Sequence, residues 1–174
     1  MTKAKKRLLT LLLAMLMAVG MAVPTFAAPR EIRTEIQPYS NSLYRLNTKT
    51  VPHDYANVNL WQNTGHESQR WNFSYYGGGL YSVGVTVAPK YCLNIIRSTG
   101  NCTVLDYAEN LTSDYLVKLV DESALYGTDA YGLVLPQHVK VLQRDADPTE
   151  NGINVSWGAP GELGKQQHQI WIMF

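Results

Sequence analysis

Helical periodicity is missing from most of this sequence. Beyond residue 27, no segment keeps apolar residues at helical spacing for three turns. Runs such as LYSVGVTV, YGLVL and VKVLQ are instead rich in β-branched and aromatic residues, and turn residues such as Gly77-Gly78-Gly79 and Pro136 bound them. The absence of helices predicts an all-β domain, a barrel or sandwich of short strands.

Long hydrophobic runs are also rare, and the clearest one lies at the N-terminus. Lys3, Lys5, Lys6 and Arg7 precede an apolar stretch from Leu8 to Val23, and Thr25-Phe26-Ala27 resembles a small-residue cleavage site. The stretch is shorter than the ~20 residues that span a bilayer comfortably. Residues 1–27 are therefore predicted to be a secretion signal peptide, with an uncleaved anchor as the alternative, and the domain is expected to be secreted and extracellular.

Basic clusters are absent from the remaining residues, 28–174. Four of the 15 Lys and Arg residues leave with the signal, so 11 basic residues face 14 acidic ones and the net charge is −3. A mildly acidic domain gives no support for nucleic-acid binding or for adhesion to anionic lipid. We expect no nucleic-acid partner and no membrane insertion after signal cleavage.

Cysteine is scarce, since only Cys92 and Cys102 occur. In an exported chain two cysteines are most simply paired, and the turn residues Ser98-Thr99-Gly100 lie between them. The sequence therefore predicts one disulfide that pins a hairpin. A reactive thiol or a metal site is the alternative, but neither a nearby histidine nor a second cysteine pair supports it.

Catalytic motifs are lacking as well. The four histidines, His53, His66, His138 and His168, show no metal-binding spacing, and no HExxH or GxSxG motif occurs. We expect no enzyme activity, no metal and no cofactor. Asn-x-Ser/Thr triplets occur at Asn72, Asn101, Asn110 and Asn154, but two of them fall within predicted strands, which favours chance occurrence over glycosylation.

The chain does contain an internal repeat, marked by its four tryptophans. Trp61 pairs with Trp71 and Trp157 with Trp171, and the second member of each pair ends a Gln-x-Trp triplet. The segments NVNLWQNTGHESQRWNF and INVSWGAPGELGKQQHQIWIMF share the same order of features: a β-branched run, an aromatic residue, a glycine-containing turn and the triplet. Such self-similarity indicates a repeat architecture.

A degenerate middle copy fits between these two. Tyr107 takes the place of the first aromatic residue, and Tyr115-Leu116-Val117 takes the place of the triplet. A leucine followed by an amide begins each copy: Leu46-Asn47, Leu93-Asn94 and Leu142-Gln143. The amide positions are 47 and 49 residues apart. Three units of about this length predict a closed, pseudo-threefold all-β domain.

These motifs resemble the ricin-type β-trefoil lectin family, whose units carry a Cys-Leu-Asp-like start, a Leu-Trp-like strand and a Gln-x-Trp triplet. The resemblance covers residues 28–174 as one domain and implies about twelve strands in units of approximately 30–73, 74–119 and 120–174. It also implies one shallow sugar pocket per unit. The carbohydrate-binding residues carried over from the family are Asn47, Asn59, Trp61, Ser68 and Gln69 in the first unit, Asn94, Tyr107 and Asp114 in the second, and Gln143, Trp157, His168 and Gln169 in the third.

The chemistry divides the tryptophans into two classes. A sugar presents a C–H face that packs on an aromatic plane and hydroxyls that require both donors and acceptors, which favours Trp61 and Trp157 as stacking residues beside short amides. Trp71 and Trp171 are predicted to lie in the core, and Gln69 and Gln169 also suit a structural role inside the strand turns. The chain has amides where the family has an aspartate, which weakens hydrogen bonding to a sugar.

The sequence thus predicts a secreted, non-catalytic lectin-like module that binds glycans or polysaccharide. The alternative is a β-trefoil scaffold, an inhibitor or a toxin accessory, that binds another secreted or cell-surface protein and carries degenerate sugar sites.

Overall fold

The computed structural model describes residues 31–48, 51–108, 114–161 and 166–174. The predicted signal peptide and Asn110 lie outside these residues, so both predictions remain open. Within the described ranges, no helix is long and apolar enough to cross a membrane.

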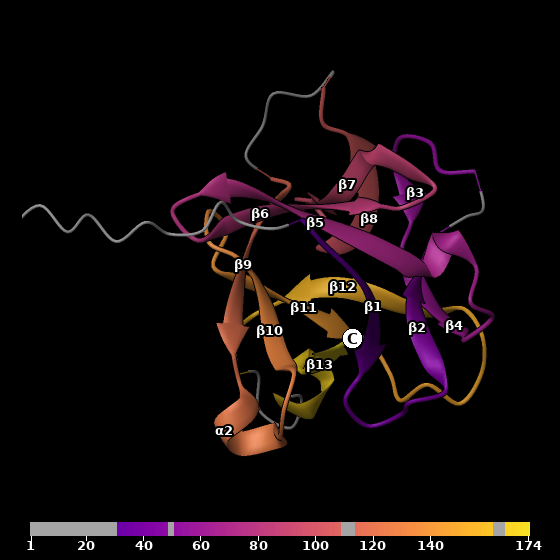
Figure 1. Cartoon of the computed structure of the whole chain (residues 1–174), viewed down its shortest axis with the longest axis vertical. Helices are drawn as coiled ribbons and strands as arrows, with labels where there is room; N and C mark the ends of the chain where they lie inside the picture. The colour runs from indigo at the N-terminus through magenta and orange to yellow at the C-terminus, as the bar shows by residue number, and fades with distance from the viewer. Residues whose placement is uncertain (1–30, 49–50, 109–113, 162–165) are drawn as a thin grey trace, which may run out of the picture. The chain divides into compact units, whose positions relative to one another are not determined.

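A closed barrel of six antiparallel strands forms the centre of the fold (Figure 1). Each barrel strand pairs with the next, and the last pairs with the first. In order around the ring the strands are β1 (Ile32–Pro38), β5 (Arg70–Gly77), β6 (Leu80–Val85), β9 (Leu116–Asp121), β10 (Ala130–Leu135) and β13 (Trp171–Met173). Closure leaves none of these strands with a free edge.

Three further hairpins join one another beside the barrel. They are β2–β4 (Tyr44–Asn47 with Asn59–Gln62), β7–β8 (Ala88–Ile96 with Asn101–Asp106) and β11–β12 (Lys140–Arg144 with Ile153–Gly158). β12 pairs with both β4 and β8, and the short strand β3 (Ala56–Asn57) pairs with β8. Each hairpin therefore touches the other two.

Chain order groups the strands into three units of two barrel strands around one hairpin: β1-β2-β4-β5, β6-β7-β8-β9 and β10-β11-β12-β13. These are twelve strands, as predicted, with β3 in addition. The predicted unit boundaries at residues 73 and 119 fall inside β5 and β9. In the described part of the chain the helical elements are single turns: η1 (Glu67–Gln69), α2 (Ser123–Tyr126) and η2 (Gln166–Gln169).

The core confirms the structural role predicted for Trp71 and Trp171. Both side chains are fully buried, and each indole nitrogen donates to a backbone carbonyl at 3.0 Å, Trp71 to Leu46 and Trp171 to Leu142. A buried indole needs such an acceptor. Each tryptophan thus ties the final strand of its unit to the hairpin of the same unit.

Three asparagines, one from each unit, form a closed ring of hydrogen bonds. Asn57 donates to Asn154 at 3.0 Å, Asn154 donates to Asn101 at 2.9 Å, and Asn101 donates to Asn57 at 2.7 Å. Each residue begins an Asn-x-polar-apolar sequence: NVNL, NCTV and NVSW. Asn101 and Asn154 also begin Asn-x-Ser/Thr triplets, and their place in the ring gives them a structural role.

The predicted disulfide is wrong. Cys92 and Cys102 are both buried free thiols. Cys92 pairs with Leu105, whereas Cys102 pairs with Ile95, three residues beyond Cys92 on β7. Because side chains alternate along a strand, the two sulfur atoms point to opposite faces of the hairpin, and three residues separate them by about 10 Å. No disulfide can form at that geometry.

Burial should also make both thiols unreactive in the folded protein. Desolvation raises the pKa of Cys92 to about 12 and raises that of Cys102 as well. Both groups should therefore stay protonated at neutral pH, and the contribution of Cys92 to stability is lost as the pH rises from about 9 toward 12. We expect Ellman's reagent to detect no fast thiol in the native protein and two after denaturation without reductant. If the denatured sample also failed to react with Ellman's reagent, the two cysteines would be joined in a disulfide.

Candidate functional site

The outward face of the β2–β4 hairpin brings the predicted first-unit residues together. Leu46 pairs with Leu60, and both are fully buried. Their neighbours in the strands therefore lie on the other face of the hairpin: Asn47 lies opposite Asn59, and Arg45, which is 8% exposed, lies opposite Trp61. Trp61 is 40% exposed, so part of its ring is open to solvent.

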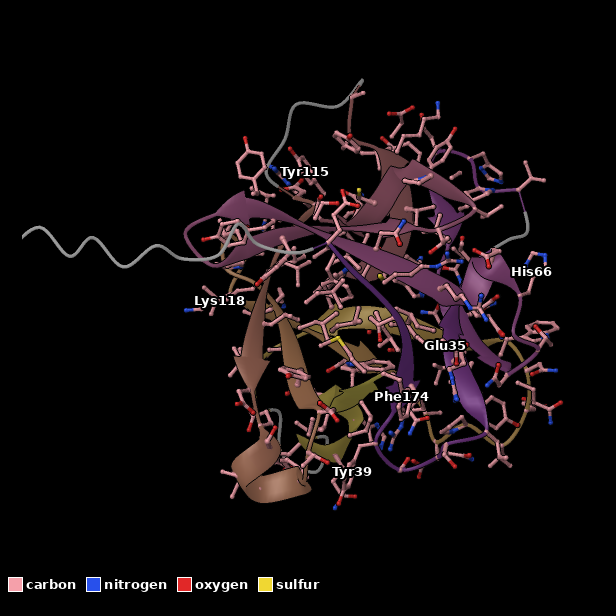
Figure 2. All side chains as sticks on the ribbon, in the orientation of Figure 1. Glu35, Tyr39, His66, Tyr115, Lys118 and Phe174 are labelled. Carbon is pink, nitrogen blue, oxygen red and sulfur yellow. The ribbon has the colours of Figure 1, made fainter. Side chains whose placement is uncertain are left out.

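A polar network orders the amides of this surface. Asn47 donates through Nδ2 to Oδ1 of Asn59 at 3.0 Å and accepts at Oδ1 from the hydroxyl of Ser68 at 3.1 Å. Nδ1 of His66 accepts from the backbone N–H of Ser68 at 3.1 Å and lies 2.9 Å from its hydroxyl oxygen. His66 precedes η1, and its side chain is shown in Figure 2. Asn47, Asn59, Trp61, Ser68 and His66 together are called the first-unit patch below.

Gln69 belongs to the structure beneath this patch. Its side chain is 1% exposed, its oxygen accepts from the backbone and hydroxyl of Thr64 at 2.8 and 3.0 Å, and its nitrogen donates to the carbonyl of Gln62 at 2.8 Å. These bonds fix the loop that follows Trp61. Gln69 thus positions the aromatic residue, and nothing of its side chain reaches the surface.

The prediction that Trp157 provides a stacking surface in the third unit is wrong. Trp157 pairs with Leu142 as Leu60 pairs with Leu46, so it occupies a core position. It is 2% exposed, and its indole donates to the carbonyl of Asn94 at 3.1 Å. The sequence alignment was one residue out of register, and one residue reverses the face of a strand.

The position equivalent to Trp61 is instead Gly158. A Cβ atom built on Gly158 would lie 2.0 Å from Oε1 of Gln143, so the side chain of Gln143 occupies the space where an aromatic ring would begin. Gln143 itself is 6% exposed and accepts from Nε2 of Gln169 at 3.1 Å. The predicted third pocket is thus filled by one of its own residues.

The two remaining third-unit residues have structural surroundings. Gln169 repeats the role of Gln69, since it accepts from the backbone of Gly161 at 3.0 Å and donates to the carbonyl of Ala159 at 2.7 Å. His168 is half-buried, and its Nε2 lies 3.8 Å from Oδ1 of Asp147. Gln169 is 5% exposed and lies at the edge of a hollow that Tyr126 also lines, away from the position of Trp157.

The predicted middle pocket is also dispersed. Asn94 is 3% exposed and donates to the carbonyl of Ile95 at 3.1 Å. It lies opposite Thr103, four residues before Tyr107, which places Tyr107 about 13 Å further along the hairpin. The residue equivalent to Trp61 is Leu105, which is buried. Asn94 and Tyr107 therefore do not form one site.

Asp114 is committed to ion pairs. Its carboxylate accepts from Nε and Nη2 of Arg97, both at 2.9 Å, and lies 2.6 Å from Nε2 of His138. Burial raises the pKa of Asp114, but hydrogen bonds and charge from Arg97 and His138 outweigh burial, and the pKa is lowered from its ordinary value. With its oxygens engaged, Asp114 has little capacity left for a sugar hydroxyl.

Sequence reasoning missed His66 and the asparagine ring. His66 gives no sequence signal beyond its place two residues before Ser68. The asparagine ring does have a sequence signal, because the shared Asn-x-polar-apolar order places Leu60, Val104 and Trp157 in register. Among the residues that the structure describes, no three His, Cys, Asp or Glu side chains gather where they could hold a metal ion.

No family model matches the sequence, and no curated protein matches it. Solved structures do resemble it in fold. A designed threefold-symmetric protein, ThreeFoil, superposes with a TM-score of 0.67 at 20% identity over 81% of this chain and 96% of that one. The fold is a β-trefoil.

Two lectins are among the similar structures. The agglutinin of Rhizoctonia solani has a TM-score of 0.65 at 12% identity, over 84% of this chain and 96% of its own. The C-half of an earthworm R-type lectin, solved in complex with GalNAc, has a TM-score of 0.57 at 12% identity, over 81% and 96%. At these identities the likeness is one of fold.

Proposed function

We propose that the protein is a secreted, non-catalytic carbohydrate-binding module whose sugar site is the first-unit patch. The observation that carries this proposal is the exposed ring of Trp61 beside an ordered pair of amides. A sugar ring would lay its C–H face on the indole, and its hydroxyls would bond to Asn47 and Asn59.

The hydrogen bonds within the patch define what it offers a ligand. Asn47 donates one amide hydrogen to Asn59, and among the described residues its second amide hydrogen and both of those of Asn59 have no partner. The patch is therefore rich in donors and carries no carboxylate among its members, which suits the oxygen acceptors of a neutral sugar. Binding at one such shallow site is expected near the millimolar range, about −4 kcal/mol, so that function depends on multivalent display.

A glycan array probed with the parent protein and with Trp61→Ala tests this proposal. We expect the variant to bind at least tenfold more weakly, because the stacking face is lost. Tyr39→Ala is the matched control, since Tyr39 is 38% exposed and lies outside the patch, and it should bind as the parent does. A parent that binds no glycan, or a Trp61→Ala protein that binds normally, would contradict the proposal.

The second candidate function is a scaffold that binds another protein. It is favoured by the third unit, where Gln143 fills the position of a sugar-stacking ring above Gly158. A partner captured from secreted proteins and not displaced by simple sugars would support this function over the first.

A further inference from the structure

A groove of about 460 Å³ lies away from the first-unit patch, between the β5–β6 hairpin and the segments that flank β8 and β9. Four tyrosines line it: Tyr75, Tyr76, Tyr107 and Tyr115. Tyr75, Tyr76 and Tyr107 are 41%, 66% and 42% exposed. Several large exposed rings around one hollow are uncommon on a soluble domain and mark a binding surface.

Three of the four rings, those of Tyr75, Tyr107 and Tyr115, pack against neighbouring rings. The ring centroids of Tyr107 and Tyr115 are 5.8 Å apart, and Tyr75 packs edge-on against Tyr81 at 5.4 Å. The pKa of Tyr115 is raised by partial burial and by the proximity of Tyr76, Cys92 and Tyr107. Side chains that already rest against one another lose little entropy when a ligand arrives. Tyr115 is shown in Figure 2.

The fold does not require these tyrosines. Gln62, Asp106 and Ala159 are equivalent in the three units, so the residues that follow them, Asn63, Tyr107 and Pro160, are equivalent too. At this position only the middle unit carries an aromatic ring.

The substitution at Tyr115 is more telling. The other two units have Gln69 and Gln169 at this position, each of which fixes its loop through buried hydrogen bonds. The middle unit has Tyr115 in place of this structural glutamine, and its phenol ring lines the groove. Departures from a rule that the rest of the fold follows are expected at functional sites.

The polar lining of the groove decides between ligand classes. Asn72, Ser74 and Ser82 contribute amide and hydroxyl groups from β5 and β6, and Glu31 contributes a carboxylate. The carboxylate can accept from a sugar hydroxyl, whereas the prolines of a proline-rich peptide have no backbone N–H to donate. Glu31 also disfavours an acidic sugar through like-charge repulsion.

We propose that this tyrosine-lined groove is a second saccharide site, independent of the first-unit patch, which takes a neutral oligosaccharide or polysaccharide segment. Tyr76 and Tyr107 stack on sugar rings, and the amide, hydroxyl and carboxylate groups bond to the hydroxyls. The groove shares no residue with the first-unit patch, and of the predicted middle pocket it includes Tyr107 but neither Asn94 nor Asp114. The two sites therefore let one domain bind one polysaccharide at two points.

Affinity electrophoresis in native gels separates the two sites. Trp61→Ala protein, which lacks the stacking face of the first-unit patch, should still be retarded by at least one of galactomannan, arabinoxylan and mixed-linkage β-glucan. Adding Tyr76→Ala and Tyr107→Ala to it should weaken that binding at least tenfold, and Tyr76→Ala alone should weaken it less. Both rings are exposed, so these variants should stay folded. Tyr55→Ala is the control, since Tyr55 is exposed and lies outside both sites.

Three results would overturn the second site. Trp61→Ala protein that no polysaccharide in the panel retards shows that the groove binds no neutral glycan. Equal retardation with and without Tyr76 and Tyr107 shows that binding occurs elsewhere. The groove is a peptide site if no polysaccharide retards the protein and the protein instead binds a fluorescent proline-rich decapeptide. The double tyrosine substitution must then abolish peptide binding. None of these results changes the test of the first-unit patch, which compares the parent protein with Trp61→Ala on the glycan array.

Discussion

Trp157→Ala should lower the free energy of unfolding by about 3–5 kcal/mol, the usual cost of removing a buried tryptophan. Two losses combine in this substitution. The core loses a large side chain that is 2% exposed, and the carbonyl of Asn94 loses the indole donor at 3.1 Å. Urea denaturation followed by circular dichroism measures the change. Trp157→Phe keeps most of the volume and should cost less.

The same experiment separates the two tryptophans that the sequence treats alike. Trp61 pairs outward on β4, so Trp61→Ala should change the free energy of unfolding by about 1 kcal/mol or less while weakening glycan binding. If Trp157→Ala unfolded at the parent's urea concentration but lost glycan binding, Trp157 would be a surface residue and the register of β12 would be wrong.

Gly84→Ala should be the next most damaging substitution, with a loss of about 1–3 kcal/mol. Gly84 pairs with Cys92 where the β6–β7 ladder shifts register, and a Cβ atom there would lie 2.4 Å from the backbone oxygen of Pro89. A backbone oxygen cannot rotate away as a side chain can. The strand must therefore move, and the thermal midpoint measured by calorimetry should fall.

Gly158→Ala provides the comparison. Its Cβ atom would meet Gln143 at 2.0 Å, but the contact is with the end of a flexible side chain. Gln143 can turn aside and lose its bond from Gln169, which costs about 1 kcal/mol. A Gly158→Ala protein that loses as much stability as the Gly84→Ala protein would contradict the distinction between rigid and movable neighbours.

The fold was predictable from the sequence because its strongest signals are structural. The Gln-x-Trp triplets mark Trp71 and Trp171, which occupy equivalent core positions, and the glutamines of these triplets fix equivalent loops. Side-chain alternation correctly placed Phe73 and Val117 inward as well. These residues recur because every unit must close the same barrel.

The candidate site was only partly predictable, because the units differ in loop length. The residue at the position of Trp61 precedes the end of the triplet by 10 residues in the first unit, by 12 from Leu105 to Val117, and by 13 from Gly158 to Trp171. Constant spacing therefore selected Tyr107, which lies 10 residues before Val117, whereas the aromatic residue type selected Trp157, which lies 14 residues before Trp171. The disulfide failed for a related reason, because closeness in sequence says nothing about which face of a hairpin each sulfur occupies.

The ring of Asn57, Asn154 and Asn101 has a direction, since each amide donates to the next and accepts from the previous one. Two units docked together make one of its three bonds, and the arrival of the third unit makes the other two at once. If one side-chain amide were rotated by 180°, two donors would face each other at one contact and two acceptors at another. The last docking step therefore forms more of these hydrogen bonds than the step before it. This favours a chain that folds as one cooperative unit over one that accumulates an intermediate with two units docked.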